Sequence, residues 1–145
     1  YTPVDLRGQK QIAEKEIGGL IPLFAGIPDT HQADLLNRYL SDLHQRNFYL
    51  CPSFDVDSPQ FDSKRYWRGP VWPHMNWMIY HGLKKYGYQE TANILKADTL
   101  KLVEKLGFYE YYEPQKSIAK TLTKGYGGDT FSWTASSIID LIHER

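Results

Sequence analysis

The chain is organised around one stretch, Arg65-Tyr66-Trp67-Arg68-Gly69-Pro70-Val71-Trp72-Pro73. A solvent-facing loop does not need that much aromatic surface, and a buried helix would not hold two prolines and two arginines. Pro73 suits the first turn of a helix, so the stretch predicts a loop that ends where a helix begins. A cleft that stacks rings on a ligand and binds its hydroxyl groups could use all of these side chains.

A second aromatic stretch, Phe108-Tyr109-Glu110-Tyr111-Tyr112-Glu113-Pro114, places carboxylates among rings. The aromatic content of the whole chain is 14%, with eleven Tyr and four Trp, and both stretches are rich in these rings. Aromatic faces stack on the C–H faces of sugars. We therefore predict that the two stretches line one carbohydrate site.

The composition limits the possible partners. A length of 145 residues fits one domain, and an apolar content of 41% excludes a disordered chain. The formal net charge is zero, so nucleic acid is a poor candidate partner. No run approaches the roughly 18 apolar residues of a membrane span. The N-terminal residues do not resemble a signal peptide, so we expect a cytoplasmic location. They also lack an initiator Met, so we expect a piece of a longer protein.

Apolar periodicity predicts an all-α chain. Apolar residues recur at helical spacing in segments 32–44, 73–85, 91–106 and 132–143. Asp29 is a candidate N-cap for the first of these, with Gln32 at the capping-box position. The apolar residues expected to point inward from the last helix are Ala135, Ile138, Ile139 and Ile142. Helices of this length joined by long connections indicate a helical bundle or a slice of an α/α toroid.

Glu110 is the candidate catalytic residue, because it lies between two tyrosines just after a predicted helix end. Partial burial among rings would raise the pKa of its carboxyl. Glycoside hydrolysis generally needs two carboxylates, one that protonates the leaving oxygen and one that activates water or attacks. A solvated loop glutamate is the alternative interpretation. Glu113, which precedes Pro114, is expected to form a turn and to be exposed.

The aromatic residues Tyr66, Trp67, Trp72 and Trp133 could be sugar platforms or core residues. For Tyr66 and Trp67, which stand beside two arginines, we favour the site, whereas Trp133 fits the core equally well. Arg68 could bind a substrate carboxylate through two hydrogen bonds, or could tie its loop to a structural acid.

The sequence predicts no metal ion and no cofactor. Asp55, Asp57 and Asp62 lack the glycine and terminal glutamate of a calcium loop, so we expect them to form turns. The five histidines show no metal-ligand spacing. The segment 125–128, Gly-Tyr-Gly-Gly, is interpreted as a flap over the site or a flexible connection.

The ordered motifs together resemble glycoside hydrolase family 63. Beside the stretch 65–72, the motifs that carry this resemblance are Asn76-Trp77, Gly82-Leu83, Tyr86-Gly87, Gly107-Phe108, Glu110-Tyr111-Tyr112, Pro114 and Phe131-Ser132-Trp133-Thr134-Ala135. The upstream segment 17–23, Ile-Gly-Gly-Leu-Ile-Pro-Leu, is similar to the bacterial branch that hydrolyses mannosylglycerate and glucosylglycerate. The resemblance covers roughly residues 17–143.

This resemblance implies an (α/α)6 toroid with its site in the mouth of the barrel. It implies inverting hydrolysis of an α-glycosidic bond, with Glu110 as the general base that activates water. Tyr66 and Trp67 fall where glycerate-hydrolysing members contact the acid end of the substrate, and Trp72 falls where the glycone sugar binds.

The sequence departs from the family in three ways. The family's general acid, an aspartate in an upstream motif, has no match here. An (α/α)6 toroid needs about twelve helices, and the periodicity gives four or five, so the chain resembles the C-terminal third of such an enzyme. Gln115-Lys116 follow Pro114, where the family commonly has Thr-Gly.

Two functional hypotheses follow. In the first, the chain is the C-terminal portion of an inverting glycosidase that acts on an α-mannosyl- or α-glucosyl-glycerate or a related α-glucoside, and it has little activity alone. In the second, it is a non-catalytic carbohydrate-binding module or a self-associating helical fragment. Its expected partners are a small carbohydrate substrate, and either a second copy or the N-terminal portion of the same enzyme.

Overall fold

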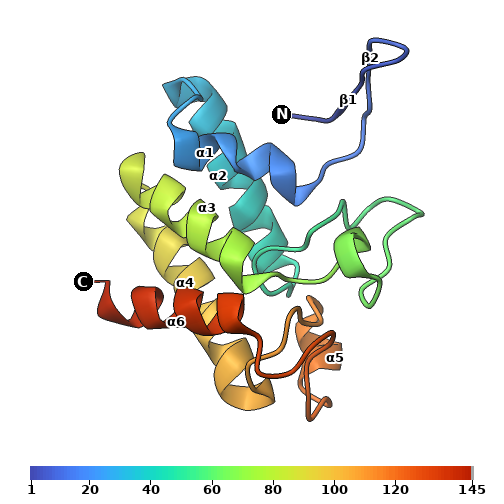
Figure 1. Ribbon diagram of the computed structural model, residues 1–145. Helices are drawn as coiled ribbons and strands as arrows, with labels where there is room; N and C mark the ends of the chain where they lie inside the picture. Colours follow the sequence, from blue (N-terminus) through green and yellow to red (C-terminus); the bar gives the residue numbers. More distant parts are fainter. Residues whose placement is uncertain (145) are drawn as a thin grey trace.

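The computed structural model describes residues 1–144 and is mainly helical (Figure 1). Its elements in chain order are β1 (Val4–Asp5), β2 (Lys10–Gln11), the 3₁₀ turn η1 (Ile17–Leu20), α1 (Pro22–Ala25), α2 (Thr30–Gln45), the 3₁₀ turn η2 (Tyr66–Arg68), α3 (Pro73–Lys85), α4 (Gln89–Leu106), α5 (Lys116–Ala119) and α6 (Ser132–His143). The short strands β1 and β2 pair antiparallel, with Val4 opposite Gln11, and this hairpin projects from the helices. The predicted all-α class and the four long helices are confirmed.

Local chemistry explains where the long helices begin and end. The backbone N–H of Gln32 donates to Oδ1 of Asp29 at 2.8 Å, and the N–H of Asp29 donates to Oε1 of Gln32 at 3.1 Å, which completes the predicted capping box of α2. Pro73 occupies the first turn of α3, where its missing N–H costs no helical hydrogen bond. Gly107 ends α4 with a φ of 91°, a conformation that glycine adopts without strain.

Helix α3 is the centre of the packing, because it contacts α1, α4 and α6. Ile79 and Leu83 on this helix are fully buried, together with Leu23 of α1 and Leu95 of α4. At Gly82, a Cβ atom would lie 2.7 Å from the backbone of Leu23, so only glycine lets α1 approach α3 this closely. A second group of buried apolar residues includes Val71 and Tyr112, one from each aromatic stretch, together with Leu102 of α4.

Asn76 fastens α3 to the connection that follows α2. Its amide nitrogen donates to the carbonyl oxygen of Leu50 at 2.7 Å and to Oγ1 of Thr99 at 2.8 Å. Its amide oxygen accepts from the backbone N–H of Cys51 at 3.1 Å. All four residues are buried, so these polar groups have no access to compensating water.

The prediction for the inner face of α6 is partly wrong. Ile138 is buried with 5% exposure, as expected, and Leu141 is fully buried. Ile139 and Ile142, in contrast, are each 60% exposed in the described part of the chain. The apolar residues of α6 therefore extend beyond the side that carries Ile138 and Leu141, and α6 packs on α3. No helix within residues 1–144 is both long and apolar enough to cross a bilayer.

We predict that Asn76→Ala lowers the free energy of unfolding by about 2–4 kcal/mol, because it leaves the Leu50 carbonyl and the Cys51 N–H buried without partners. Urea unfolding followed by circular dichroism at 222 nm measures this change. The control is Asn93→Ala on the exposed side of α4, which should change stability by less than about 0.5 kcal/mol. Equal effects of the two substitutions would contradict the role given to Asn76.

Candidate active site

Two backbone hydrogen bonds join the aromatic stretches. The N–H of Val71 donates to the carbonyl oxygen of Tyr112 at 2.8 Å, and the N–H of Tyr112 donates to that of Val71 at 2.9 Å. The side chains of both residues are completely buried. The pairing fixes the register of the two stretches, and it brings Trp72 and Tyr111 together although they are far apart in the sequence.

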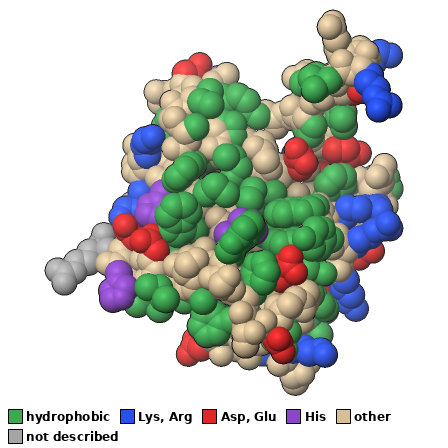
Figure 2. All heavy atoms as spheres, in the orientation of Figure 1, with side chains coloured by type: hydrophobic (Ala, Val, Ile, Leu, Met, Phe, Trp, Pro, Cys, Tyr) green, Lys and Arg blue, Asp and Glu red, His purple; other side chains and the backbone are tan. Residues whose placement is uncertain are grey.

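The aromatic cluster is built around Trp72, which is 2% exposed. Its ring stacks on Trp67, with centroids 3.9 Å apart and planes 10° apart, and on Tyr111, with centroids 4.9 Å apart. Tyr66 meets Trp72 edge-on at 4.8 Å. Tyr66 and Trp67 keep 48% and 41% of their surface exposed. Figure 2 shows hydrophobic side chains gathered on this face, over η2 and the start of α3. The cluster is therefore anchored at Trp72 and open at Tyr66 and Trp67.

Tyr66 has an unusual backbone conformation. Its φ is 35°, which few residues other than glycine adopt, and it begins the short turn η2. Its carbonyl oxygen accepts a hydrogen bond from Nε1 of Trp72 at 3.2 Å. Strained backbone of this kind persists only where the surroundings enforce it, and it is common at functional sites.

Glu110 lies at the open edge of the aromatic cluster and is half-buried. Its Oε1 accepts a hydrogen bond from the Tyr66 hydroxyl at 3.1 Å. A Cβ atom on Gly127 would clash with Oε2, so the glycine leaves room for the carboxylate. The backbone of Tyr126 pairs with that of Tyr111, with N–H to carbonyl distances of 2.9 and 3.3 Å. The segment 125–128 therefore lies directly beside Glu110.

The prediction that Glu113 is exposed is wrong. This side chain is completely buried. It accepts hydrogen bonds from the Ser63 hydroxyl at 2.8 Å and from the backbone N–H of Gln115 at 3.1 Å. Burial raises the pKa of its carboxyl, and the two hydrogen bonds oppose that shift. Glu113 ties the loop before η2 to the second aromatic stretch.

Arg68 and Trp133, the two remaining candidate site residues, make different contacts. Arg68 donates from Nε and Nη2 to the carbonyl oxygen of Gln60, at 3.0 and 2.6 Å, and so braces its own loop. The sequence suggested that Arg68 could tie its loop to an acidic side chain, but its partner in the loop is a backbone carbonyl. Trp133 is 60% exposed in the described chain, which does not fit a core position, and its ring lies 5.1 Å from His74.

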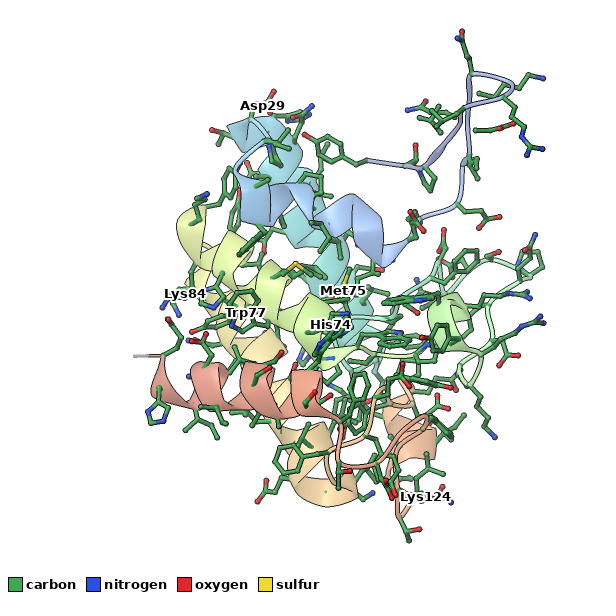
Figure 3. The ribbon with its side chains drawn as sticks, viewed as in Figure 1. Asp29, His74, Met75, Trp77, Lys84 and Lys124 are labelled. Atoms are coloured by element: carbon green, nitrogen blue, oxygen red, sulfur yellow. The ribbon has the colours of Figure 1, made fainter. Side chains whose placement is uncertain are left out.

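His74 is a member of the cluster that the spacing of the histidines in the sequence does not reveal. It stands in the first turn of α3 and faces α6, as does Trp77 (Figure 3). Its ring meets Trp67, Trp72 and Trp133 edge-on, with centroids 5.1–6.2 Å apart. Its Nδ1 atom is buried without a hydrogen-bond partner among residues 1–144. Burial lowers the pKa of the imidazole, and the charge of Glu110 partly opposes this.

A family model described as the Mannosylglycerate hydrolase MGH1-like glycoside hydrolase domain matches residues 1–134. The chain belongs to this family. The match confirms the resemblance to glycoside hydrolase family 63 that the motifs predict. The family assignment makes Glu110 and the aromatic cluster parts of a glycoside hydrolase domain.

Several proteins of this glycoside hydrolase family resemble the chain. The mannosylglycerate hydrolase of Thermus thermophilus is 43% identical over 136 residues, which are 94% of this chain and 31% of that protein. The mannosylglycerate hydrolase of Rubrobacter radiotolerans is 34% identical over 99% of this chain and 32% of its own length. A glucosylglycerate hydrolase of Mycolicibacterium hassiacum is 34% identical over 91 residues, 63% of this chain and 19% of that protein. The chain thus spans about a third of the two mannosylglycerate hydrolases.

The fold agrees with the family. The crystal structure of a family 63 mannosylglycerate hydrolase from Thermus thermophilus in complex with glucose superposes with a TM-score of 0.86 at 42% identity. The superposition covers 97% of this chain and 34% of that one. It confirms the expectation that the helices are a C-terminal portion of a helical toroid.

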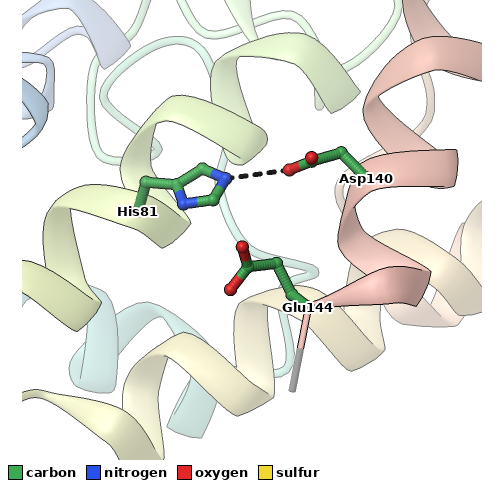
Figure 4. A group of neighbouring side chains, drawn as sticks. All are labelled: His81, Asp140 and Glu144. Carbon is green, nitrogen blue, oxygen red and sulfur yellow. Dashed lines mark hydrogen bonds and ion pairs between the residues drawn. The ribbon is translucent and has the colours of Figure 1, made fainter.

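One group of potential metal ligands lies away from the aromatic cluster of this hydrolase domain. His81 of α3 and Asp140 and Glu144 at the end of α6 have ligand atoms within 4.8 Å of one another (Figure 4). Nε2 of His81 lies 3.1 Å from Oδ2 of Asp140, which also accepts from Nε1 of Trp77 at 2.6 Å. Nζ of Lys84 is 2.5 Å from Oε2 of Glu144. These bonds tie α3 to α6, and the lysine already supplies the positive charge beside Glu144.

The three aspartates of the loop before η2 form turns, as expected. Oδ1 of Asp55 accepts from the N–H of Asp57 at 3.2 Å, and Oδ1 of Asp62 accepts from the N–H of Lys64 at 3.0 Å. Asp57 forms two hydrogen bonds with the guanidinium group of Arg46, at 3.0 and 2.5 Å. Each carboxylate therefore has a structural partner in the loop.

We predict that His74 titrates below the ordinary histidine pKa of about 6.5, because burial disfavours the imidazolium ion. Glu110→Gln should lower this pKa further, since the Glu110 charge favours the protonated ring. The unfolded chain binds the proton more readily, so His74 contributes to a loss of stability as pH falls below about 6.5. Titration of the ring signals by NMR tests both shifts, and a His74 midpoint at or above about 6.5 would refute the assignment.

Proposed function

We propose that this domain takes part in the inverting hydrolysis of an α-mannosyl- or α-glucosyl-glycerate or a related α-glucoside, with Glu110 as the general base. The observation that carries the proposal is the placement of one accessible carboxylate at the open edge of an aromatic cluster. Glu110 is the carboxylate whose charge acts on His74, Tyr66 and Tyr111. The relatives named as mannosylglycerate and glucosylglycerate hydrolases support the substrate class.

The hydrogen bond from Tyr66 suits Glu110 to act as a base. The bond to Glu110 raises the pKa of the Tyr66 phenol, so the phenol stays protonated and donates to Oε1. The other carboxylate oxygen can then accept a proton from water. The water oxygen forms a bond to the anomeric carbon as the bond to the glycerate oxygen breaks. The departing oxygen takes a proton from a general acid, and the sugar leaves with inverted configuration.

The aromatic cluster supplies binding surface in this scheme. Trp72 lies at its base and is 2% exposed, with its ring stacked on Trp67 and Tyr111. The binding of the glycone sugar at Trp72 therefore stays a prediction, and it would require one of these two rings to move. Tyr66 and Trp67, which are half-exposed, would contact the glycerate end of the substrate. Arg68 would have to exchange its bonds with the Gln60 carbonyl for bonds to a substrate carboxylate. The role of Arg68 as a substrate ligand therefore stays a prediction. The hydrogen bonds in the structure give Arg68 a structural role in its own loop.

The general acid has to come from outside the aromatic cluster. Glu113 is the other glutamate of the second stretch, and it is completely buried and bonded to Ser63 and Gln115. A buried group with these partners cannot protonate a substrate at the open edge. For residues 1–145 alone we therefore propose sugar binding without turnover, with the acid supplied by the remaining portion of the enzyme.

The test uses a chimera in which this chain replaces the matching segment of the Thermus thermophilus mannosylglycerate hydrolase. We predict that Glu110→Gln lowers kcat for α-mannosylglycerate by about 10²–10⁴-fold, because the amide cannot accept a proton from water. Glu113→Gln is the matched control three residues away. It should leave kcat within about tenfold while lowering the melting temperature, because it disturbs a buried hydrogen-bond pair.

Two results would refute the proposal. One is a Glu110→Gln chimera that hydrolyses α-mannosylglycerate at nearly the parent rate. The other is an α-anomer as the first product seen by proton NMR, since inversion of an α-glycoside yields the β-anomer. Calorimetry of the 145-residue chain with the same glycoside tests the binding proposal, and product formation in that experiment would show that the chain holds an acid.

A further inference from the structure

The two ring nitrogens of His74 lie in different surroundings. Nδ1 is buried without a hydrogen-bond partner among residues 1–144. Nε2 also has no partner in this part of the chain, but it is not one of the buried atoms, so it remains accessible. A buried polar atom without a partner destabilises the folded chain, and an apolar ring in the same place would avoid this penalty. Packing alone therefore does not account for an imidazole at this position.

The difference between the two nitrogens indicates which of them carries the proton. Burial lowers the pKa of His74, so its ring is neutral at about pH 7 and holds one proton. On Nδ1 this proton would form an N–H group that is buried without an acceptor. On Nε2 the same proton can reach water or a ligand. We therefore expect the Nε2–H form, which has a hydrogen-bond donor at the accessible nitrogen.

The ring that carries this donor lies among the aromatic residues of the candidate site. The imidazole meets Trp67, Trp72 and Trp133 edge-on, and Trp133 is 60% exposed. Figure 3 shows His74 at the start of α3, where it faces α6. The charge of Glu110 also acts on His74. Aromatic rings offer a sugar apolar faces, whereas its orientation depends on a few polar groups at fixed positions. A donor in contact with three indole rings meets this requirement.

We propose that His74 is a further substrate-binding residue of this site, and that its Nε2–H group donates a hydrogen bond to a hydroxyl group of the sugar ring. The inference rests on the proposed function, because it takes the aromatic cluster as the sugar site. The role is binding and not acid catalysis, since a neutral imidazole does not release its remaining proton near neutral pH. The general acid therefore still comes from outside the cluster.

Three substitutions separate the contributions of the two nitrogens and the ring. The amide nitrogen of glutamine is as many bonds from the backbone as Nε2, and that of asparagine is as many bonds away as Nδ1. Phenylalanine keeps an aromatic ring and has neither nitrogen. His74→Gln should therefore retain the donor to the sugar, whereas His74→Asn and His74→Phe should lose it. His74→Phe also removes the buried Nδ1, so it should leave the melting temperature unchanged or raise it.

Binding is measured in the chimera with the Thermus thermophilus enzyme, with Glu110→Gln present so that turnover does not interfere. In calorimetry with α-mannosylglycerate, His74→Phe and His74→Asn should each raise Kd about tenfold, the loss expected of one hydrogen bond. His74→Gln should keep Kd within about threefold of the value for the chimera with His74. Monodeoxy derivatives of the mannosyl ring then identify the acceptor. For one of them, His74→Phe should no longer weaken binding, because that bond is already lost.

Nitrogen NMR of the same chimera, labelled at histidine, locates the proton. The signals of His74 are assigned by their loss in His74→Gln. At about pH 7.5, where the neutral ring predominates, they should show a protonated Nε2 and an unprotonated Nδ1. Addition of α-mannosylglycerate should shift the Nε2 signal and leave that of Nδ1 nearly unchanged.

Unchanged binding in His74→Phe would overturn the proposal, as would equal Kd values for His74→Asn and His74→Gln, or a proton found on Nδ1. A loss of binding that follows a loss of melting temperature would give the ring a structural role, and would also overturn it. So would a folded chimera that does not bind the glycoside. The base is tested separately, because hydrolysis by Glu110→Gln at nearly the parent rate would refute the proposed function and leave the order of the His74 Kd values intact.

Discussion

The reciprocal pair of hydrogen bonds between Val71 and Tyr112 is the interaction on which the site depends. Loops of this length have little local structure to fix their register, and a slip of one residue would turn each side chain to the opposite face. Both residues are shielded from water, so the pair is not in competition with solvent. Tyr112 then points into the core, where its hydroxyl donates to the Gly107 carbonyl at 2.7 Å, and Tyr111 joins Trp72 in the cluster.

Helix α3 connects this pairing to the stability of the domain. At its start, Trp72 and His74 join the aromatic cluster, and Asn76 binds the Leu50–Cys51 backbone. Further along the helix, the absence of a side chain at Gly82 lets α1 pack closely against α3. The family motifs on this helix therefore combine two functions. Its N-terminal end shapes the site, while Asn76 and Gly82 set the packing that holds that end in position.

The sequence predicts the elements whose signals are local. The capping box at Asp29 and Gln32, the proline at the start of α3 and the helical periodicity all act within a few residues, and each is found where expected. The environment of Glu113 is not local, because it depends on Ser63 from the loop before η2. The same holds for His81, because Asp140 lies on α6 and Glu144 directly follows that helix. The roles of Tyr66, Trp67, Arg68, Trp72 and Glu110 in catalysis stay predictions, although the structure does bring Glu110 to Tyr66.

Glu110 and Glu113 show why proximity in sequence says little about chemical role. Glu113 is held by two hydrogen bonds in a dry site, where exchanging a proton with substrate is impossible without opening the loop. Glu110 accepts one side-chain hydrogen bond within residues 1–144, from the Tyr66 hydroxyl, and its side chain is only half-buried. A single carboxylate can perform one half of an acid–base hydrolysis.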